Sequence, residues 1–326
     1  MTILVTGCAG FIGYHWAKNL LDQGFEVFGV DNLNSYYNPV YKDLRLSNLK
    51  KYKNFNFSEI DLINVESTKK IIIKSQPITI YHLAAQAGVR LPLKNWHQYT
   101  LNNEIAFLNI LNFIDHDVTK NFFYASSSSV YGKENKVMRE DVNSLQPSSY
   151  YGLTKYSNEL TAKIFSNGNP LKIRGLRFFS VYGPYGRPDM AYFRLFRSAY
   201  LNEAFNLNGN GLIRRDFTYI DDVINCIQKL SEQLKTNHEG FNDVVNIGGN
   251  RPVSVNTLIN KVKEISGLSI EIKYANSDKL DLDITQASTE YLHKLIGYIP
   301  DTILESGLTY VNKWFKENLN TIQKDK

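Results

Sequence analysis

Three short motifs in this sequence could together remove a hydride and a proton from an alcohol carbon. The glycine-rich string Thr6-Gly7-Cys8-Ala9-Gly10-Phe11-Ile12-Gly13 can hold a dinucleotide pyrophosphate. A serine run, Ser126-Ser127-Ser128-Ser129, follows later in the chain. The string Tyr151-Gly152-Leu153-Thr154-Lys155 then places a phenol and an ammonium one helical turn apart. Each motif alone is weak, so the prediction depends on their order and spacing.

Tyr151 and Lys155 are the candidate catalytic pair. A free tyrosine has a pKa of about 10, so Tyr151 must become more acidic by about 3 units to act as a base near neutral pH. A nearby ammonium and an oxidised nicotinamide can have that effect in a partly desolvated site. The same spacing joins Tyr14 and Lys18. That second pair falls on the helix whose start is needed for the pyrophosphate, so we expect it at the surface.

The serine run follows an expected strand at residues 122–126 and precedes the helix that carries Tyr151. A hydroxyl at this strand end can donate a hydrogen bond to the substrate oxygen as it becomes a carbonyl. Ser127 is the preferred candidate, with Ser126 and Ser128 as its neighbours. The alternative is that the run only ends a strand.

Gly7, Gly10 and Gly13 follow an apolar run and open an expected helix. In this setting the first glycine permits a tight turn, the second lets a phosphate approach the backbone, and the third lets helix and strand pack closely. Free amides and the positive helix end would then face the pyrophosphate.

The end of the second expected strand carries Asp31, whose carboxylate can accept hydrogen bonds from both hydroxyls of an adenosine ribose. The same carboxylate would repel a 2′-phosphate, which predicts NAD as the cofactor in preference to NADP. Asp61 could accept the adenine amino group or cap a strand end, and the sequence leaves both open. The predicted cofactor-binding residues are Gly7, Gly10, Phe11, Ile12, Gly13, Asp31, Asn32, Asp61, Leu62, Leu83, Ala84, Ala85, Tyr151 and Lys155.

Strand and helix patterns alternate through the first half of the chain. Strands are expected at residues 3–6, 26–30, 54–60, 78–83, 122–126 and 171–179, and helices at 11–23, 65–74, 96–115 and 148–166. This alternation predicts the α/β class: a Rossmann-type, doubly wound parallel sheet with helices on both faces and right-handed connections.

After Phe179 the pattern is less regular. Residues 181–188 are rich in turn formers and are expected to form a loop. Further elements are expected as a helix near 190–202, strands at 205–207 and 216–220, and a strand at 244–247 that could rejoin the main sheet. We therefore expect a dinucleotide-binding domain at 1–178 and a smaller mixed α/β domain at 179–326 that mainly binds the substrate, with segments near 216–250 interleaving with the first.

The composition excludes several classes of protein. The 326 residues are 43% hydrophobic and 21% charged, as in globular proteins. No apolar run approaches the ~20 residues that span a bilayer, and the start lacks a secretion signal, so we expect a cytoplasmic protein without membrane contact. Cys8 and Cys226 are the only cysteines, which excludes a disulfide framework, and no metal is predicted. The net charge of +5 is scattered, so nucleic-acid binding is not expected.

Together the motifs resemble the extended short-chain dehydrogenase/reductase family and, within it, the nucleotide-sugar epimerase group. The likeness extends over nearly the whole chain and is greatest to UDP-glucuronate 4-epimerases of polysaccharide biosynthesis. The strings that carry it lie at residues 31–34, 82–90, 125–132, 177–184, 186–191 and 215–222. The resemblance implies that Asn103 and Lys155 touch the cofactor and that Phe179 lies beside the nicotinamide and the sugar.

The resemblance also implies a reaction, the NAD-dependent C4 epimerisation of a UDP-sugar, with UDP-glucuronate converted to UDP-galacturonate as the first choice. Tyr151 would take the proton of the sugar 4-hydroxyl while the C4 hydride passes to NAD+. The 4-keto sugar would turn over in the pocket, and the hydride would return to its other face. Because NAD+ is regenerated, it should stay bound through the cycle.

The substrate contacts are implied in the same way. Ser180 stands where the family usually has Thr or Asn, and its hydroxyl could bind the sugar. Arg215 resembles the arginine that holds the UDP diphosphate, and Asp278 stands for an acidic residue that holds the uridine ribose. Arg187 lies in a Gly/Pro-rich loop where its guanidinium could grip a C6 carboxylate, face solvent or contact the diphosphate. The predicted substrate-binding residues are Arg90, Ser127, Ser128, Tyr151, Ser180, Arg187, Arg215 and Asp278.

Other functions stay open. Neutral UDP-glucose or UDP-N-acetylglucosamine 4-epimerisation is the next choice. UDP-glucuronate decarboxylation is less favoured, because the resembled decarboxylases carry a glutamate, and the dehydratases an Asp-Glu pair, where this chain has Ser128-Ser129. A noncatalytic NAD-binding scaffold is disfavoured by the intact Tyr151/Lys155 pair. In the resembled family, the helices expected at 96–115 and 148–166 form a four-helix bundle, which implies a homodimer.

Overall fold

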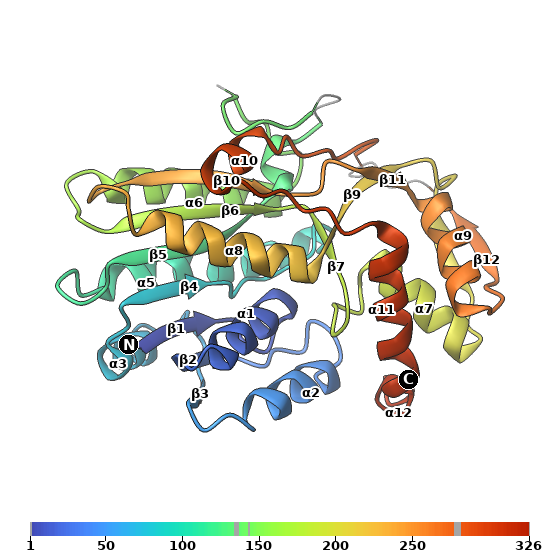
Figure 1. The fold of residues 1–326 in the computed structure, drawn as a ribbon, viewed down its shortest axis with the longest axis horizontal. Coiled ribbons are helices and arrows are strands. Elements are labelled where there is room, and N and C mark those ends of the chain that lie inside the picture. The colour runs from blue at the N-terminus through green and yellow to red at the C-terminus, as the bar shows by residue number, and fades with distance from the viewer. Residues whose placement is uncertain (1, 134–136, 143, 277–281, 326) are drawn as a thin grey trace.

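A seven-stranded parallel sheet organises the N-terminal part of the chain in the computed structural model, which describes residues 2–133, 137–142, 144–276 and 282–325 (Figure 1). From edge to edge its strands are β10 (Asn242–Ile247), β6 (Lys172–Phe178), β5 (Asn121–Ser127), β4 (Thr79–His82), β1 (Thr2–Thr6), β2 (Glu26–Asp31) and β3 (Phe55–Glu59). The strand order reverses between β1 and β4. In open sheets of this kind, ligands bind at the carboxyl ends of the strands beside such a reversal. The predicted Rossmann-type sheet is confirmed.

Helices cover both faces of this sheet. One face carries α1 (Phe11–Asp22), α2 (Val40–Leu49) and α8 (Ile220–Leu234), and the other carries α3 (Val65–Ser75), α5 (Ala106–Phe113) and α6 (Tyr150–Ser166). The side chains of β1 show why two layers are needed. Ile3 and Val5 join the core beneath α1 and α8, whereas Leu4 joins the core beneath α3 and α5. A strand buried on both faces reads as a continuous apolar run, as this one does.

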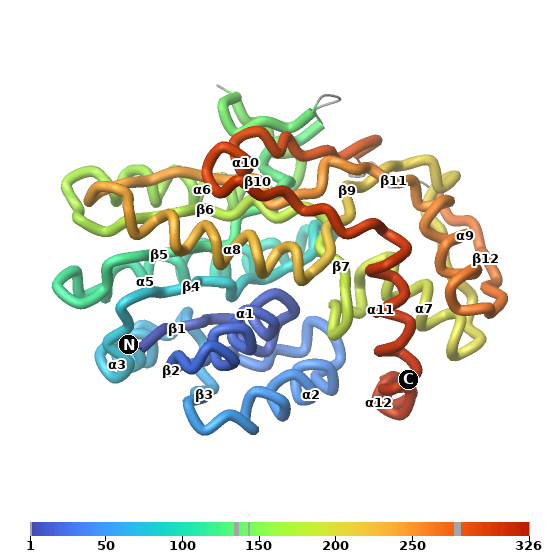
Figure 2. The backbone as a smooth tube through the Cα atoms, viewed as in Figure 1, coloured from blue at the N-terminus to red at the C-terminus, as the bar shows by residue number. Residues whose placement is uncertain are grey.

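The C-terminal part is smaller and mixed. A three-stranded sheet contains β7 (Ser180–Tyr182), β9 (Arg214–Tyr219) and β11 (Pro252–Ser254), and a parallel pair contains β8 (Phe205–Asn208) and β12 (Ile272–Ala275). Its helices are α7 (Ala191–Leu201), α9 (Val255–Ser266), α11 (Leu304–Glu317) and α12 (Leu319–Gln323). The chain crosses between the two parts more than once: β10 lies beside β6 in the main sheet, as expected, and α10 (Glu290–Ile296) packs on α8 (Figure 2).

Two of the expected elements differ in the structure, and helices that were not expected are present, among them α2 and α8. The long helix expected at 96–115 is divided into α4 (His97–Tyr99), a π-helical segment (Thr100–Ile105) and α5, and a 3-10 turn (Leu93–Asn95) precedes it. Segments of this π type often occur at functional sites. The expected loop at 181–188 is wrong at its start, because residues 180–182 pair with residues 217–219 of β9 as strand β7. Among the helices of the described residues, none combines the length and apolar character needed to cross a bilayer.

Candidate active site

The carboxyl ends of the central strands and the loop after β7 line a cavity of about 680 Å³. Its volume suits a large organic ligand. The predicted residues that line it are Gly7, Gly10, Phe11, Ile12, Gly13, Asp31, Asn32, Asp61, Leu62, Leu83, Ala84, Ala85, Arg90, Ser127, Ser128, Tyr151, Lys155, Phe179, Ser180, Arg187 and Arg215. Asn103 does not line it, and Asp278 lies outside the described residues. The fold thus gathers residues from most of the chain around one space.

One end of the cavity is a tight glycine turn between β1 and α1. Gly7 has a φ of +70°, and a Cβ atom there would lie 2.7 Å from the backbone nitrogen of Ala84. A Cβ atom at Gly13 would overlap the carbonyl oxygen of Gly7. Larger residues therefore do not fit at these two positions. The turn leaves the start of α1 facing the cavity, which is the arrangement that binds a dinucleotide pyrophosphate.

Asp31 lies next to this turn. One carboxylate oxygen accepts a hydrogen bond from the Ala9 backbone N–H at 3.2 Å, and the other accepts one from the Leu33 N–H at 2.9 Å. The Lys42 ammonium is 3.5 Å from the carboxylate and also donates to the side chain of Asn34 at 3.1 Å. Lys42 lines the cavity, but sequence reasoning missed it because α2 itself was not expected.

Asp61 and Asn103, two predicted cofactor-binding residues, both form hydrogen bonds within the protein. One oxygen of Asp61 accepts from the Ile63 N–H at 3.0 Å, as a strand-end cap would, although the side chain also lines the cavity. The Asn103 amide instead holds Gln86 from both sides, accepting from its N–H at 2.8 Å and donating to its carbonyl at 3.3 Å, and it also donates to Thr154 at 3.0 Å. Asn103 therefore connects the loop after β4 to α6.

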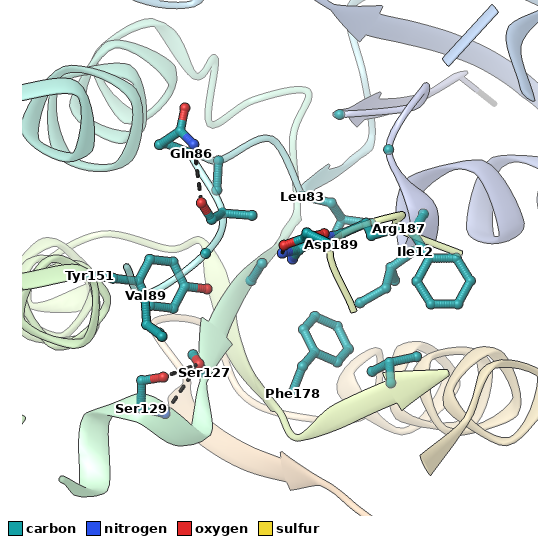
Figure 3. A pocket seen from close by; sticks show the side chains of 18 of the residues that line it. Ile12, Leu83, Gln86, Val89, Ser127, Ser129, Tyr151, Phe178, Arg187 and Asp189 are labelled. Carbon is teal, nitrogen blue, oxygen red and sulfur yellow. Dashed lines mark hydrogen bonds and ion pairs between the residues drawn. The ribbon is translucent and has the colours of Figure 1, made fainter. Parts of the chain in front are cut away.

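Tyr151 stands in the first turn of α6, where the Ser149 side chain caps the helix by accepting from the Gly152 N–H at 3.1 Å. The ammonium of Lys155 is 5.9 Å from the centre of the Tyr151 ring. Figure 3 shows Tyr151 and Ser127 on one side of the cavity and Arg187 across from them. The helical spacing thus brings the predicted pair to the same wall.

Burial raises the pKa of Tyr151, while the positive charge of Arg187 and a hydrogen bond with Ser127 act in the opposite direction. Sequence reasoning assigns the acidifying effect to Lys155, but in the structure Arg187 is the cation that lowers the Tyr151 pKa. Burial itself lowers the pKa of Lys155 to about 8. The protein alone therefore keeps the phenol protonated near neutral pH, so further positive charge is needed to make it a base.

The shift of Lys155 gives a pH-dependent contribution to stability. Its pKa is about 8 in the folded protein and 10.5 in the reference state, so between these values the unfolded chain binds more protons and the free energy of unfolding rises with pH. Relative to Lys155→Met, the NAD-free wild type should gain about 2 kcal/mol from about pH 7.5 to about pH 9.5 in urea unfolding. The exposed Lys163→Met on the same helix should show no such trend. A wild-type advantage independent of pH would contradict the burial of the ammonium.

The serine run is divided between two environments. Ser127 accepts a hydrogen bond from the Ser129 N–H at 3.1 Å and donates to its hydroxyl at 3.2 Å, at the wall of the cavity. Ser126 donates to the buried Glu159 carboxylate at 2.5 Å, which also receives two hydrogen bonds from Arg177, each of 2.8 Å. The Glu159–Arg177 pair therefore fixes the end of β5, from which Ser127 reaches the cavity.

Arg187 is held by a carboxylate that sequence reasoning did not assign. Its Nε donates to Asp189 at 3.0 Å, and its Nη2 donates to the second Asp189 oxygen at 2.5 Å. The Tyr36 hydroxyl also donates to Asp189, at 3.4 Å. Burial would lower the pKa of Arg187, but the Asp189 charge raises it, so the guanidinium stays charged. The signal for Asp189 was its position two residues after Arg187.

Two further arginines line the cavity. Arg215 on β9 donates through Nη1 to the carbonyls of Leu282 at 2.6 Å and Arg214 at 3.0 Å. Arg90 follows the loop after β4 and is exposed at the cavity. Both lie on the same cavity as Arg187 and Tyr151, as a site for an anionic ligand requires.

A sequence profile described as the NAD dependent epimerase/dehydratase family matches residues 3–248. The chain belongs to this family. It is 36% identical to a UDP-glucuronate 4-epimerase of Thermodesulfobacterium geofontis, with 98% of each chain covered. Family membership agrees with the resemblance noted in the sequence.

Solved structures are similar over almost the whole chain. A UDP-glucuronic acid 4-epimerase from Bacillus cereus, in complex with UDP-glucuronic acid and NAD, is 33% identical with a TM-score of 0.90, covering 97% of this chain and 99% of that one. A UDP-glucose 4-epimerase from Thermotoga maritima, with UDP-glucose, is 30% identical with a TM-score of 0.87, covering 98% and 100%.

NAD is the cofactor of this family member, and the residues present fit it. The glycines at positions 7 and 13 let β1, α1 and the loop after β4 pack closely enough to form the turn that presents the start of α1 to the cavity. Asp31 lines the cavity at the end of β2, where the ribose hydroxyls of a dinucleotide are bound.

The second Tyr-x-x-x-Lys pair in this epimerase-family chain is placed differently from the expectation. Lys18 is partly exposed and forms an ion pair with Asp22, but Tyr14 is buried, with 2% of its surface exposed. The Tyr14 ring packs against Tyr185, with ring centres 4.9 Å apart. The predicted surface location of Tyr14 is therefore wrong, because the loop that carries Tyr185 covers this face of α1.

Proposed function

We propose that the protein catalyses the C4 epimerisation of UDP-glucuronate to UDP-galacturonate. The observation that carries this proposal is the meeting of Tyr151, Ser127, Arg187 and the glycine turn in one cavity. A phenol and a hydroxyl stand on one wall to act on an alcohol, and a guanidinium stands opposite to hold an acidic group. The likeness to UDP-glucuronate 4-epimerases supports the same choice.

The chemistry starts at the sugar 4-hydroxyl. Tyr151 accepts its proton, and the Ser127 hydroxyl donates a hydrogen bond to the same oxygen as a carbonyl forms. When bound, NAD+ accepts the C4 hydride and later returns it to the opposite face of the ring. Lys155, buried next to Tyr151, contacts the cofactor and keeps positive charge near the phenol. Tyr151 returns the proton when the 4-keto sugar is reduced.

Contacts away from C4 keep the intermediate in the cavity while the sugar turns. Arg215 binds the UDP diphosphate, Arg90 lines the same region, and the hydroxyls of Ser128 and Ser180 face the sugar. Phe179 provides an apolar surface beside the ring. Binding energy from the nucleotide can thus be used at the reacting carbon.

Arg187 is the group that favours a uronate. Asp189 occupies Nε and Nη2, so Nη1 and the second hydrogen of Nη2 can still donate to a carboxylate. Asp189 thereby fixes the plane of the guanidinium, which strengthens a two-bond contact but also offsets part of its charge.

Neutral UDP-glucose 4-epimerisation is the second candidate. The partial neutralisation of Arg187 by Asp189 and the likeness to a UDP-glucose 4-epimerase both favour it. Decarboxylation has less support. Within the described part of the chain, the carboxylates that line the cavity are Asp31 at the end of β2, Asp61 after β3 and Asp189 in its ion pair, so none stands free beside Tyr151.

The function is tested by incubating the purified protein separately with UDP-glucuronate, UDP-glucose and UDP-N-acetylglucosamine and identifying the products by NMR. We expect UDP-galacturonate from the first substrate at a kcat/KM at least about 10-fold above either neutral sugar, because a charge-assisted contact is worth over 1.4 kcal/mol. A pentose product with release of CO2 would indicate decarboxylation. A preference for a neutral sugar would replace the proposed substrate.

The exposed faces of α5 and α6 support a homodimer. Leu153, Leu160 and Ile164 form an exposed apolar stripe along α6, and Leu108 is exposed on α5. Sedimentation at micromolar concentration should therefore give twice the chain mass, and Leu160→Asp/Ile164→Asp should give the monomer mass. Leu212→Asp, at an exposed leucine of the C-terminal part, is the control and should leave the dimer intact. A wild-type monomer would contradict the proposal.

A further inference from the structure

A buried arginine that does not line the cavity connects the glycine turn to the loop before Arg187. Arg45 on α2 has 1% of its surface exposed. Its Nη1 donates to the Ala9 carbonyl at 2.9 Å and to the Tyr37 hydroxyl at 2.8 Å, its Nε donates to the Tyr185 carbonyl at 2.8 Å, and its Nη2 donates to the Gly186 carbonyl at 2.7 Å. In the described part of the chain all four of these acceptors are uncharged. Burying a guanidinium among uncharged acceptors costs free energy of folding. Two features of its contacts indicate what the buried charge contributes.

The first feature is that Arg45 helps to hold the backbone of the loop that leads to Arg187. Four consecutive carbonyls of this loop, from Gly183 to Gly186, accept hydrogen bonds from side chains. Tyr192 holds the first at 3.1 Å, His15 holds the second at 2.9 Å, and Arg45 holds the third and fourth. Burial lowers the pKa of His15 to about 4, so its ring is neutral and its Nε2–H donates. The backbone immediately before Arg187 is therefore fixed from the cofactor side of the molecule.

The second feature is that Arg45 also holds the backbone of the glycine turn. Ala9 belongs to the turn that takes the pyrophosphate, and its N–H is held by Asp31 while its carbonyl is held by Arg45. One planar group thus joins the cofactor-binding turn to the loop of Arg187. The positive charge of Arg45, which its neutral acceptors do not cancel, also favours an anion at that turn.

We propose that Arg45 is a positioning residue that couples dinucleotide binding to recognition of the sugar carboxylate. This proposal rests on the proposed function, because it takes Arg187 as the group that meets the C6 carboxylate. A lysine cannot replace Arg45, since its single nitrogen cannot reach acceptors on both segments in the geometry of a fork. Because one guanidinium holds the carbonyls of Ala9, Tyr185 and Gly186, it fixes the position of the turn relative to the backbone before Arg187.

The coupling is tested by binding measurements on the holoenzyme with Arg45→Met and Arg45→Lys, and with Lys50→Met at an exposed position at the end of α2 as the control. Calorimetry gives the Kd of UDP-glucuronate, UDP-glucose and UDP. In both Arg45 variants we expect the Kd of UDP-glucuronate to rise about 10-fold, with a change below about 2-fold for UDP and UDP-glucose. Arg45→Lys keeps the charge, so it provides the measurement if Arg45→Met does not fold.

A second experiment measures the affinity of the Arg45 variants for the cofactor. After removal of the bound nucleotide, the Kd of NADH, followed by its fluorescence, should rise about 10-fold in both variants and stay unchanged in Lys50→Met. In a double-mutant cycle, Arg187→Ala should cost much less UDP-glucuronate affinity in the Arg45→Met background than in the wild type.

Three results would overturn the coupling alone. The first is an equal loss of affinity of the Arg45 variants for all three UDP ligands, as a general loss of structure would cause. The second is an unchanged Kd for NADH in these variants. The third is that the losses of UDP-glucuronate affinity caused by Arg45→Met and by Arg187→Ala add up in the double variant. If Arg187→Ala alone weakens UDP-glucuronate and UDP-glucose equally, the assignment of the carboxylate fails, and the proposed function and this proposal fall together. If Arg187→Ala is selective and the Arg45 variants are not, only the coupling fails.

Discussion

Replacing Tyr151 with phenylalanine is expected to lower kcat for UDP-glucuronate by about 10²- to 10⁴-fold, the range for losing a positioned acid–base group. The hydroxyl is the atom that would take and return the substrate proton, and it forms a hydrogen bond with Ser127 at the wall of the cavity. The ring remains, so the affinity for UDP-glucuronate should change by less than about 3-fold. Single-turnover kinetics and calorimetry on the same preparation measure the two effects.

The neighbouring Tyr150 is the matched control for this prediction. Its hydroxyl pairs with Thr100 at 2.7 Å, and its ring stacks on Trp96 with centres 4.9 Å apart, outside the main cavity. Tyr150→Phe should therefore keep kcat within about 3-fold of the wild type, since a single surface-side hydrogen bond is lost. Equal activity of the wild type and Tyr151→Phe would show that another group moves the proton.

Replacing Arg187 with alanine is expected to lower kcat/KM for UDP-glucuronate by about 10²-fold more than that for UDP-glucose, since the loss of its positive charge near Tyr151 affects both substrates alike. Two charge-assisted hydrogen bonds to the C6 carboxylate are lost with the uronate, each worth about 1.5–3 kcal/mol, whereas a neutral C6 hydroxyl loses at most one ordinary hydrogen bond. Steady-state kinetics with both substrates measure the ratio. A similar loss for both would assign Arg187 to the diphosphate or to the loop structure.

Two further variants separate the loss of the Arg187 contact from repulsion of the uronate by Asp189. Arg187→Ala alone leaves the Asp189 carboxylate at the cavity, where it would repel a uronate. In Arg187→Ala/Asp189→Asn neither charge remains, and the selective loss should persist. Arg187→Lys keeps the charge without the fork and should recover only part of the affinity for the uronate.

The parts of the site that could be predicted from sequence are those set by local chemistry. The glycines of the first turn are required by the close approach of β1, α1 and the loop after β4, and that requirement is visible in their spacing. Tyr151 and Lys155 needed only a helix to share a face. The main sheet followed from apolar runs alternating with helical periods. Helix α8 was not expected, although Ile220, Val223, Ile227 and Leu230 recur at helical spacing and are all buried.

The parts that could not be predicted depend on partners brought together by the fold. Lys42 and Arg45 lie on a helix that mixes apolar with charged residues, and charged residues of such a helix are expected to face solvent, yet both are buried. Their partners are Asp31 for the first and the backbone of residues 185 and 186 for the second. Tyr14 is buried for the same reason, since its cover comes from Tyr185. A local sequence pattern cannot predict contacts between residues that lie so far apart in the chain.

The most direct test of the account follows a label at C4. The holoenzyme is incubated in ordinary water with UDP-glucuronate carrying deuterium at C4, and the UDP-galacturonate formed is examined by NMR. If Tyr151 moves only the hydroxyl proton while the hydride leaves C4 and returns to it, the product should keep the deuterium at C4. Loss of the deuterium to solvent would mean that C4 exchanges its hydrogen as a proton, and it would contradict transient oxidation in this cavity.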